Sequence, residues 1–179
     1  VSALTKSYPC PGRCIYCPKE KGIPKSYLSG EPAVERAKKL NFDPYLQVRK
    51  RIEMLESEGH PTDKIELRII GGSFSVYPEK YKMWFIGNCL AACNEFNKAK
   101  SEKRKAKNTK SQFKIKNLEK EQNKNKRASH RIVGMSIETR PDLITKEEIK
   151  ILRDFGVTMV EIGIQTIFDY ILKQCQRGH

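Results

Sequence analysis

Short apolar runs alternate with amphipathic stretches along most of the chain, and this alternation predicts repeated strand-then-helix units. The predicted strands cover residues 1–5, 64–70, 131–137 and 157–164. The predicted helices run over residues 43–59, from residue 78 onward, over residues 145–156 and over residues 168–175. Strands that alternate with helices imply right-handed crossovers and a parallel sheet. Four such units are too few to close a barrel, so the predicted fold is α/β, an incomplete TIM-like (β/α) barrel.

Local signals support the positions of two of these helices. Asp43 before Pro44 is a good start, because an N-cap side chain is followed by proline at the first helical position, and Gly59 predicts the end. Thr145 and Glu148, three residues apart, have the spacing of a capping box at the start of a later helix. These signals favour helices where the periodicity already indicates them.

Residues 97–128 depart from the pattern and are dominated by Lys, Asn, Gln and Ser. Such a composition cannot bury enough surface to offset chain entropy, so we expect a disordered, mobile insertion. Residues 97–131 hold 14 Lys and Arg against 3 Glu, so most of the formal net charge of +14 lies there. The run could contact nucleic-acid phosphates, but Phe113 is its one aromatic residue, and a solvated chain is the simpler interpretation.

The overall composition narrows the setting. No stretch approaches the roughly 20 apolar residues that span a bilayer, so we expect no membrane association and a cytoplasmic location. Six cysteines in a cytosolic protein indicate metal or reactive sites more readily than disulfides. The chain begins with Val1 and stops without a terminating signal, so a fragment is expected.

The strongest chemical signal is the cysteine loop directly after the first predicted strand. Cys10, Cys14 and Cys17 stand in the order Cys-x3-Cys-x2-Cys. Three thiolates on a short loop can each reach a different iron of one 4Fe-4S cluster and leave the fourth iron open. The amine and carboxylate of S-adenosylmethionine can chelate that open iron. The alternative interpretation is a structural zinc site completed by a distant fourth ligand.

The loop resembles the radical S-adenosylmethionine (SAM) enzymes, with Tyr16 as the aromatic residue expected before the third cysteine. More specifically, residues 10–18 resemble the archaeal and bacterial form of the elongator-complex catalytic subunit, the tRNA wobble-uridine carboxymethyl synthase. The resemblance covers the chain except roughly residues 97–128. Further motifs follow in the family's order: Ser26-Tyr27 with Glu31-Pro32, Asp43-Pro44-Tyr45, Gly59-His60, Asp63-Lys64-Ile65-Glu66, Gly71-Gly72-Ser73-Phe74, Ile137-Glu138-Thr139-Arg140-Pro141-Asp142, Glu161-Ile162-Gly163-Ile164-Gln165-Thr166 and Arg177-Gly178-His179.

The resemblance implies an activity and a set of partners. It implies that a cluster on the three cysteines cleaves S-adenosylmethionine to a 5′-deoxyadenosyl radical. That radical would activate acetyl-CoA for addition to carbon 5 of the wobble uridine of tRNA. It implies Lys64 as an acetyl-CoA contact, an electron donor as a further partner, and an acetyltransferase-like domain that has no counterpart in these residues. We therefore expect a chain that is inactive alone, and a homo-oligomer is one assembly it could form.

Further cofactor contacts are predicted at the carboxyl ends of the strands. The resemblance assigns the Gly71-Gly72 turn, followed by Ser73, to the methionine end of the cofactor; an ordinary strand-to-loop turn is the alternative. Polar groups at the ends of consecutive barrel strands converge on one pocket. We therefore expect cofactor or substrate contacts from three residues, with a surface salt bridge or a helix cap as an equal alternative. These are Glu138, Arg140 and Gln165.

Two other classes of protein remain open at this stage. One is a radical SAM enzyme acting on a small molecule or protein, and the other is a non-catalytic metal-bound module that binds nucleic acid.

Cys89 and Cys93, four apart on a predicted helix, could form a second metal pair, but burial in the core is favoured. Cys175 receives the same interpretation.

Overall fold

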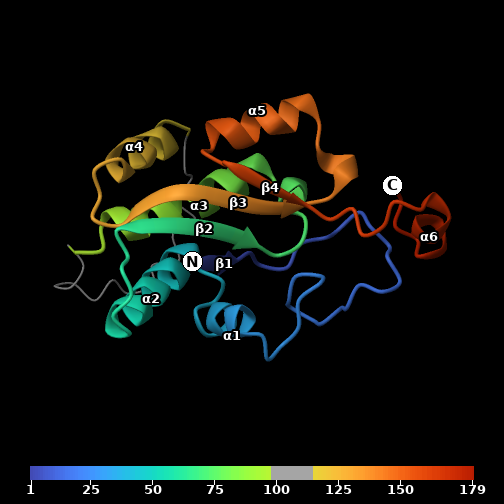
Figure 1. Cartoon of the computed structure of the whole chain (residues 1–179), viewed down its shortest axis with the longest axis horizontal. Helices are drawn as coiled ribbons and strands as arrows, with labels where there is room; N and C mark the ends of the chain where they lie inside the picture. The colour runs from blue at the N-terminus through green and yellow to red at the C-terminus, as the bar shows by residue number, and fades with distance from the viewer. Residues whose placement is uncertain (98–114) are drawn as a thin grey trace.

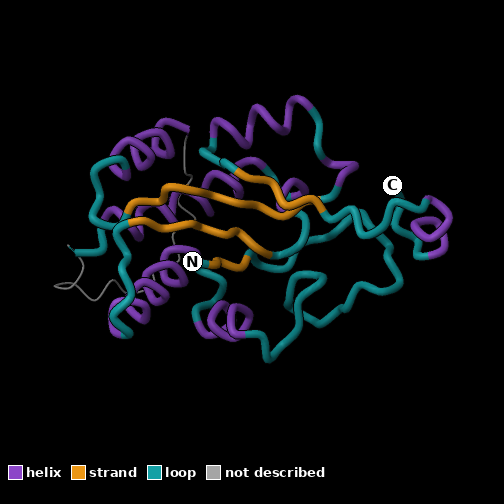
Figure 2. The backbone as a smooth tube through the Cα atoms, in the orientation of Figure 1, coloured by secondary structure: helices purple, strands orange, loops and turns teal. Residues whose placement is uncertain are grey.

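The computed structural model describes residues 1–97 and 115–179. Its centre is a four-stranded sheet in the order β1-β2-β3-β4, with every neighbouring pair parallel. The strands are β1 (Ser2–Leu4), β2 (Lys64–Ile70), β3 (Arg131–Thr139) and β4 (Met159–Ile162). The predicted α/β class and parallel sheet are confirmed, and the sheet is open rather than closed, as a partial barrel requires (Figures 1 and 2).

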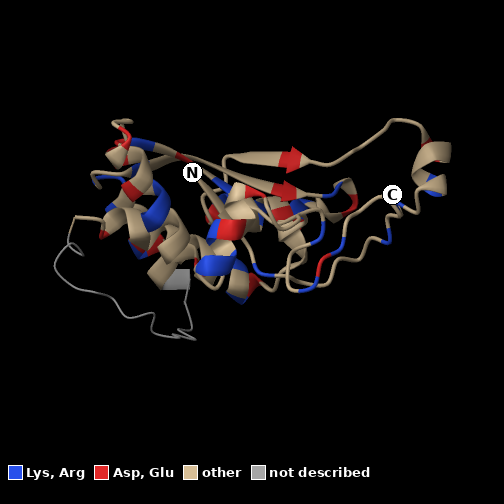
Figure 3. Cartoon of the chain, turned by 90° about the horizontal axis from the view of Figure 1, so that it is seen from below, with Lys and Arg blue, Asp and Glu red and all other residues tan. Residues whose placement is uncertain are grey.

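Within the described residues, six α-helices connect or follow the strands. They are α1 (Pro32–Lys39), α2 (Pro44–Ser57), α3 (Glu79–Asn94), α4 (Ile115–Asn125), α5 (Lys146–Asp154) and α6 (Asp169–Gln174), with short 3-10 turns η1 (Phe74–Val76) and η3 (Pro141–Leu143). Helices α2, α3 and α5 pack on one face of the sheet, whereas α6 lies beyond the carboxyl ends of the strands (Figures 1 and 3). Among the described residues, no helix is long and apolar enough to cross a membrane.

The core lies between the sheet and α2, α3 and α5. In β2, exposed and buried residues alternate over most of the strand, so Ile65, Leu67 and Ile69 face the helices. They pack into one cluster with residues such as Ile52 and Phe85. The opposite face of the sheet carries an ion pair: Arg68 of β2 pairs with Glu161 of β4 across β3 at 2.9 Å. The apolar face thus fixes the sheet, and the strand ends are free to carry polar side chains.

The first predicted helix begins as expected and also secures the edge strand. Asp43 accepts a hydrogen bond from Leu46 N at 2.9 Å, the contact expected of an N-cap. Gln47, fully buried, holds the backbone of Leu4 through Leu4 N to Oε1 at 2.9 Å and Nε2 to Leu4 O at 3.0 Å. The end of β1, immediately before the cysteine loop, is therefore anchored on both sides.

The prediction of a disordered insertion over residues 97–128 is wrong for residues 115–125, which form α4. Leu118 is buried, and Asn94 of α3 donates to Glu121 Oε2 at 2.9 Å. Asn125 in turn donates to Asn94 Oδ1 at 2.9 Å. These contacts lie along one helix face, which the polar composition concealed. Residues 98–114 of the predicted insertion lie outside the described residues.

The capping box at the start of α5 is half confirmed. Thr145 accepts a hydrogen bond from Glu148 N at 3.1 Å, as an N-cap does. The Glu148 carboxylate does not return to the cap. It pairs instead with Lys82 Nζ of α3 at 2.8 Å, and the Lys82 side chain is only 4% exposed. The Glu148 side chain therefore forms a tertiary ion pair in place of the local hydrogen bond that the capping box predicts.

Candidate cluster and cofactor site

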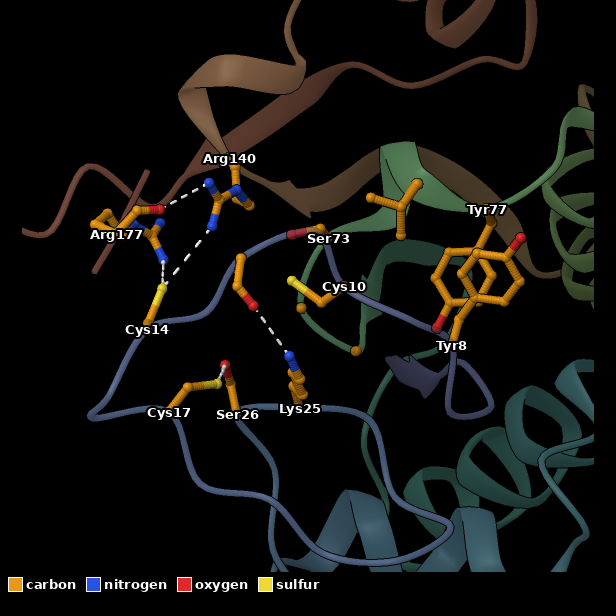
Figure 4. Close-up of a pocket in the computed structure, with 14 residues that line it drawn as sticks. Tyr8, Cys10, Cys14, Cys17, Lys25, Ser26, Ser73, Tyr77, Arg140 and Arg177 are labelled. Atoms are coloured by element: carbon orange, nitrogen blue, oxygen red, sulfur yellow. Dashed lines mark hydrogen bonds between the residues drawn. The ribbon is translucent and has the colours of Figure 1, made fainter. Parts of the chain in front are cut away.

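The cysteine loop and the ends of the strands enclose a hollow at the carboxyl edge of the sheet. Figure 4 shows Cys10, Cys14 and Cys17 around this hollow, with Arg140 and Arg177 at one end. Segments from four regions of the chain line it: Tyr8, Cys10, Gly12, Cys14, Cys17, Lys25, Ser26, Gly71, Gly72, Ser73, Val76, Tyr77, Arg140 and Arg177. The three cysteines predicted as ligands therefore share one site.

Cations and hydroxyls surround the cysteine side chains. Arg177 donates to Cys14 Sγ at 3.5 Å, and Arg140 donates to the same sulfur at 3.9 Å. The Ser26 hydroxyl lies 3.3 Å from Cys17 Sγ. Lys25 Nζ donates to Gly12 O at 3.0 Å, which ties the two halves of the loop together. The contacts of Cys14 favour negative charge on its thiol.

The acidity of Cys14 follows from these contacts. Burial by itself would raise the pKa of the Cys14 thiol, but hydrogen bonds from Arg177 and Tyr16, with the charge of Arg140, lower the pKa below its ordinary value. The thiolate is the form of cysteine that binds metal. Cys14 is thus prepared by its neighbours to act as a ligand.

The number and kind of the donors, three cysteines, are those that a 4Fe-4S cluster takes. Within residues 1–97 and 115–179, no three His, Cys, Asp or Glu side chains gather where one metal ion could join them. A zinc site needs such convergence on one atom, whereas a 4Fe-4S cluster takes each thiolate on a separate iron. Three cysteines around one hollow, beside two guanidinium groups, suit the larger anionic group.

A second hollow of about 450 Å³ adjoins the first and gathers the strand-end residues. Glu138, Arg140 and Gln165 all line it, so the structure brings together the three residues that strand-end position predicted. Gly72 and Ser73 border both hollows. The volume lies in the range of small-molecule sites. Assigning these residues to S-adenosylmethionine stays a prediction.

The glycine turn after β2 has a backbone that favours glycine. Gly71 and Gly72 have φ of 137° and 91°. A Cβ on Gly71 would lie 2.0 Å from Thr5 Oγ1, so the turn also approaches the end of β1 closely. The two backbone N–H groups point to Glu138 Oε2, at 3.2 Å and 3.0 Å. The turn is therefore occupied by a protein carboxylate.

Two predicted site residues, Lys64 and Tyr16, do not line the two hollows described above. Lys64 begins β2 opposite Arg131, and therefore sits at the amino end of the sheet, whereas the hollows lie at the carboxyl end. Tyr16 is 47% exposed and lines a separate hollow with Gln165 and Cys175. Their assignments stay predictions, and the structure does not bring Lys64 to the cysteines.

The other cysteines follow the prediction in part. Cys89 and Cys93 are buried in α3, and burial raises the pKa of Cys93 to about 12, so both remain neutral thiols in the core. This confirms core packing over a second metal pair. Cys175 is half-buried, so the expectation of full burial is wrong there. It lies at the end of α6, where its carbonyl accepts from Ile15 N at 3.1 Å.

Several polar residues that line the site were not predicted from the sequence, among them Lys25, Ser26, Tyr27 and Arg177. Arg177 donates both to Cys14 Sγ and to Gly163 O, and so joins the end of the chain to the cysteine loop. Ser26, Tyr27 and Arg177 stood in matched motifs without a role. Three thiolates in one site need nearby cations to balance their charge, and this requirement could have pointed to Arg177.

Gly12→Ala tests the placement of Arg140. A Cβ at Gly12 would lie 2.1 Å from Arg140 Nη1, and Arg140 cannot yield easily because Asp142 binds its Nε and Nη2 at 2.8 Å and 2.9 Å. We expect a loss of roughly 1–3 kcal/mol in unfolding free energy, measured by urea denaturation.

The matched control for this substitution is Gly134→Ala in β3. There the nearest atom to a new Cβ is Glu66 Cγ at 3.6 Å, an ordinary contact, so we expect little change in stability. Equal stability of the two variants would contradict the position of Arg140 beside the loop.

Comparison with known proteins places this site in a family. The model of the radical SAM superfamily matches residues 5–179. The chain therefore belongs to the radical SAM superfamily. This agrees with a fold of parallel strands that carries three loop cysteines at its carboxyl edge.

Individual relatives narrow the comparison to one group within the superfamily. Over its whole length the chain is 44% identical to the tRNA uridine(34) acetyltransferase of Methanocaldococcus infernus and 41% identical to that of Dehalococcoides mccartyi, covering 32% and 35% of them. It is 31% identical to human Elongator complex protein 3 and covers 32% of it. The solved structure of N-terminally truncated Methanocaldococcus infernus Elp3 matches 80% of this chain, and 30% of its own, with a TM-score of 0.66 and 46% identity. The chain spans about a third of these relatives' length, and the predicted resemblance to the elongator catalytic subunit is confirmed.

Proposed function

We propose that this chain is the cluster- and cofactor-binding part of a tRNA uridine(34) carboxymethyl synthase/acetyltransferase. The observation that carries the proposal is the sharing of one hollow by Cys10, Cys14 and Cys17, next to the hollow of the strand-end residues. Relatives named tRNA uridine(34) acetyltransferase supply the reaction class. Neither observation alone would connect the metal ligands to tRNA.

The residues divide into two groups by their chemistry. The three cysteines would each bind one iron of a 4Fe-4S cluster, and Arg140 and Arg177 would balance its negative charge. When bound, the cluster supplies the electron that cleaves S-adenosylmethionine to a 5′-deoxyadenosyl radical. The adjoining hollow of about 450 Å³ would hold that cofactor, with Ser73 and Gln165 among its walls.

The later steps concern partners outside the described site. The radical would activate acetyl-CoA for addition to carbon 5 of the wobble uridine, with Lys64 as the acetyl-CoA contact that the family resemblance assigns. tRNA, acetyl-CoA and an electron donor would be the partners, in the cytoplasm, and a homo-oligomer is part of the same proposal. Basic side chains of α1 and α2, such as Lys39 and Arg51, would contact tRNA phosphates.

Anaerobic reconstitution tests the proposal. The chain, supplied with iron and sulfide, is expected to bind about four irons, and spectroscopy should show a change on addition of S-adenosylmethionine. With a reductant, 5′-deoxyadenosine should form, while carboxymethyluridine should not form from this chain alone. A protein that retains zinc, or iron already saturated by four side chains, would overturn it. Carboxymethyluridine made by the chain alone would contradict the proposal that this chain binds cluster and cofactor but does not complete the reaction.

A further inference from the structure

The Glu138 carboxylate accepts three hydrogen bonds from other parts of this chain. Its Oε1 accepts a hydrogen bond from the Tyr27 hydroxyl at 2.7 Å. Its Oε2 accepts from the backbone N–H groups of Gly71 and Gly72 at 3.2 Å and 3.0 Å. An ionised carboxylate only accepts hydrogen bonds, and three donors from two distant segments already converge on this one. The sequence predicts Glu138 as a cofactor contact, and these hydrogen bonds indicate a second role for the same carboxylate.

The glycine turn depends on that carboxylate. Consecutive backbone N–H groups in a turn of this kind form a concavity that binds an anion. Here Glu138 supplies the anion from the neighbouring strand β3. It accepts hydrogen bonds from two backbone N–H groups, and leaving these groups without an acceptor would cost free energy. The conformation of Gly71 and Gly72 is therefore set from outside the turn.

Tyr27 joins the same carboxylate to the cysteine loop. It follows Cys17 in the loop before α1, and its ring packs against a small apolar cluster that includes Leu4 and Ile70. Burial, followed by the hydrogen bond and charge of Glu138, raises the pKa of Tyr27, so its hydroxyl stays protonated and able to donate. Lys25 O also approaches the turn, 3.2 Å from where a Cβ on Gly72 would lie.

We propose that Glu138 and Tyr27 are positioning residues that lock the cysteine loop onto the Gly71-Gly72 turn. The inference rests on the proposed function and deepens it. The cysteines and the turn belong to separate segments, and a reactive site needs its parts held to within about 0.5 Å. Because both segments donate hydrogen bonds to the same carboxylate, it restrains their relative position. Glu138 then acts through the turn and not as a contact of the cofactor.

The test separates this positioning role from direct cofactor binding. Tyr27→Phe removes only the hydroxyl and keeps the packed ring. We expect it to retain iron at the wild-type level, yet to weaken S-adenosylmethionine binding about tenfold, the size of one hydrogen bond to a charged group. In the chain without iron, amide hydrogen exchange over residues 71–72 should become about tenfold faster.

Two further variants complete the design. Glu138→Ala should accelerate exchange more than Tyr27→Phe, and Glu138→Gln, which keeps one carbonyl acceptor, should restore part of the protection. Tyr170→Phe is the matched control, because Tyr170 is 63% exposed, and it should change neither reading. Circular dichroism establishes that each variant is folded.

The outcomes are distinguishable. If Glu138→Ala weakens cofactor binding while Tyr27→Phe does not, Glu138 contacts the cofactor directly and the lock is wrong. If exchange over residues 71–72 is unchanged in both variants, the lock is also wrong. Failure of the wild-type chain to bind iron would count against the proposed function, while the exchange measurement on the iron-free chain would still decide the lock.

Discussion

Serine in place of Cys10, Cys14 or Cys17 is expected to abolish cluster binding in the reconstituted chain. All three side chains line one hollow, and each would supply the ligand of a different iron. A serine hydroxyl stays protonated at neutral pH and cannot replace a thiolate. Iron and sulfide per chain, together with visible absorbance, measure the loss. We expect each single variant to lose nearly all of the iron.

Cys175→Ser is the matched control for these variants. Cys175 is half-buried at the end of α6 and does not line the cysteine hollow. Its contact with the loop is made by the backbone carbonyl, which serine keeps. The control should therefore bind as much iron as the wild type. A Cys10, Cys14 or Cys17 variant with full iron content would remove that residue from the ligand set.

Glu148→Gln is expected to cost roughly 3 kcal/mol of unfolding free energy, because it leaves the Lys82 ammonium group buried beside a neutral partner. The pair joins α3 to α5 at 2.8 Å, with side-chain exposures of 4% for Lys82 and 13% for Glu148. Urea denaturation of the iron-free chain measures the change. The exposed pair of Glu35 and Lys38 provides the contrast, and Glu35→Gln should cost less than about 1 kcal/mol.

Substitution of the other partner, Lys82, should cost less unfolding free energy than Glu148→Gln. Lys82→Met frees the Glu148 carboxylate, which can turn back to the N-cap at Thr145 and complete the capping box. The double variant Lys82→Met/Glu148→Gln should recover most of the stability, since no unpaired charge stays buried. Equal losses in the two single variants, with no recovery in the double variant, would show that the ion pair is not what holds α3 and α5 together.

The family resemblance and the main elements followed from the sequence because they depend on neighbouring residues. The N-cap at Asp43 and the apolar run over residues 64–70 are local patterns, and each predicted its element correctly. Strand-end position also predicted that Glu138 and Gln165 would share one hollow, because parallel strands end at one edge. To this extent the order of residues by itself specified the fold and the position of the site.

The partners of individual side chains needed the tertiary structure. Arg177 reaches Cys14 across 163 residues of sequence, and Tyr27 reaches Glu138 across 111. Such contacts depend on how strands align and how loops pack, which no local pattern encodes. The same reason explains α4, whose Leu118 is buried and which packs against α3. The sequence thus determined which groups gather at the carboxyl edge of the sheet, and packing decided which of them touch.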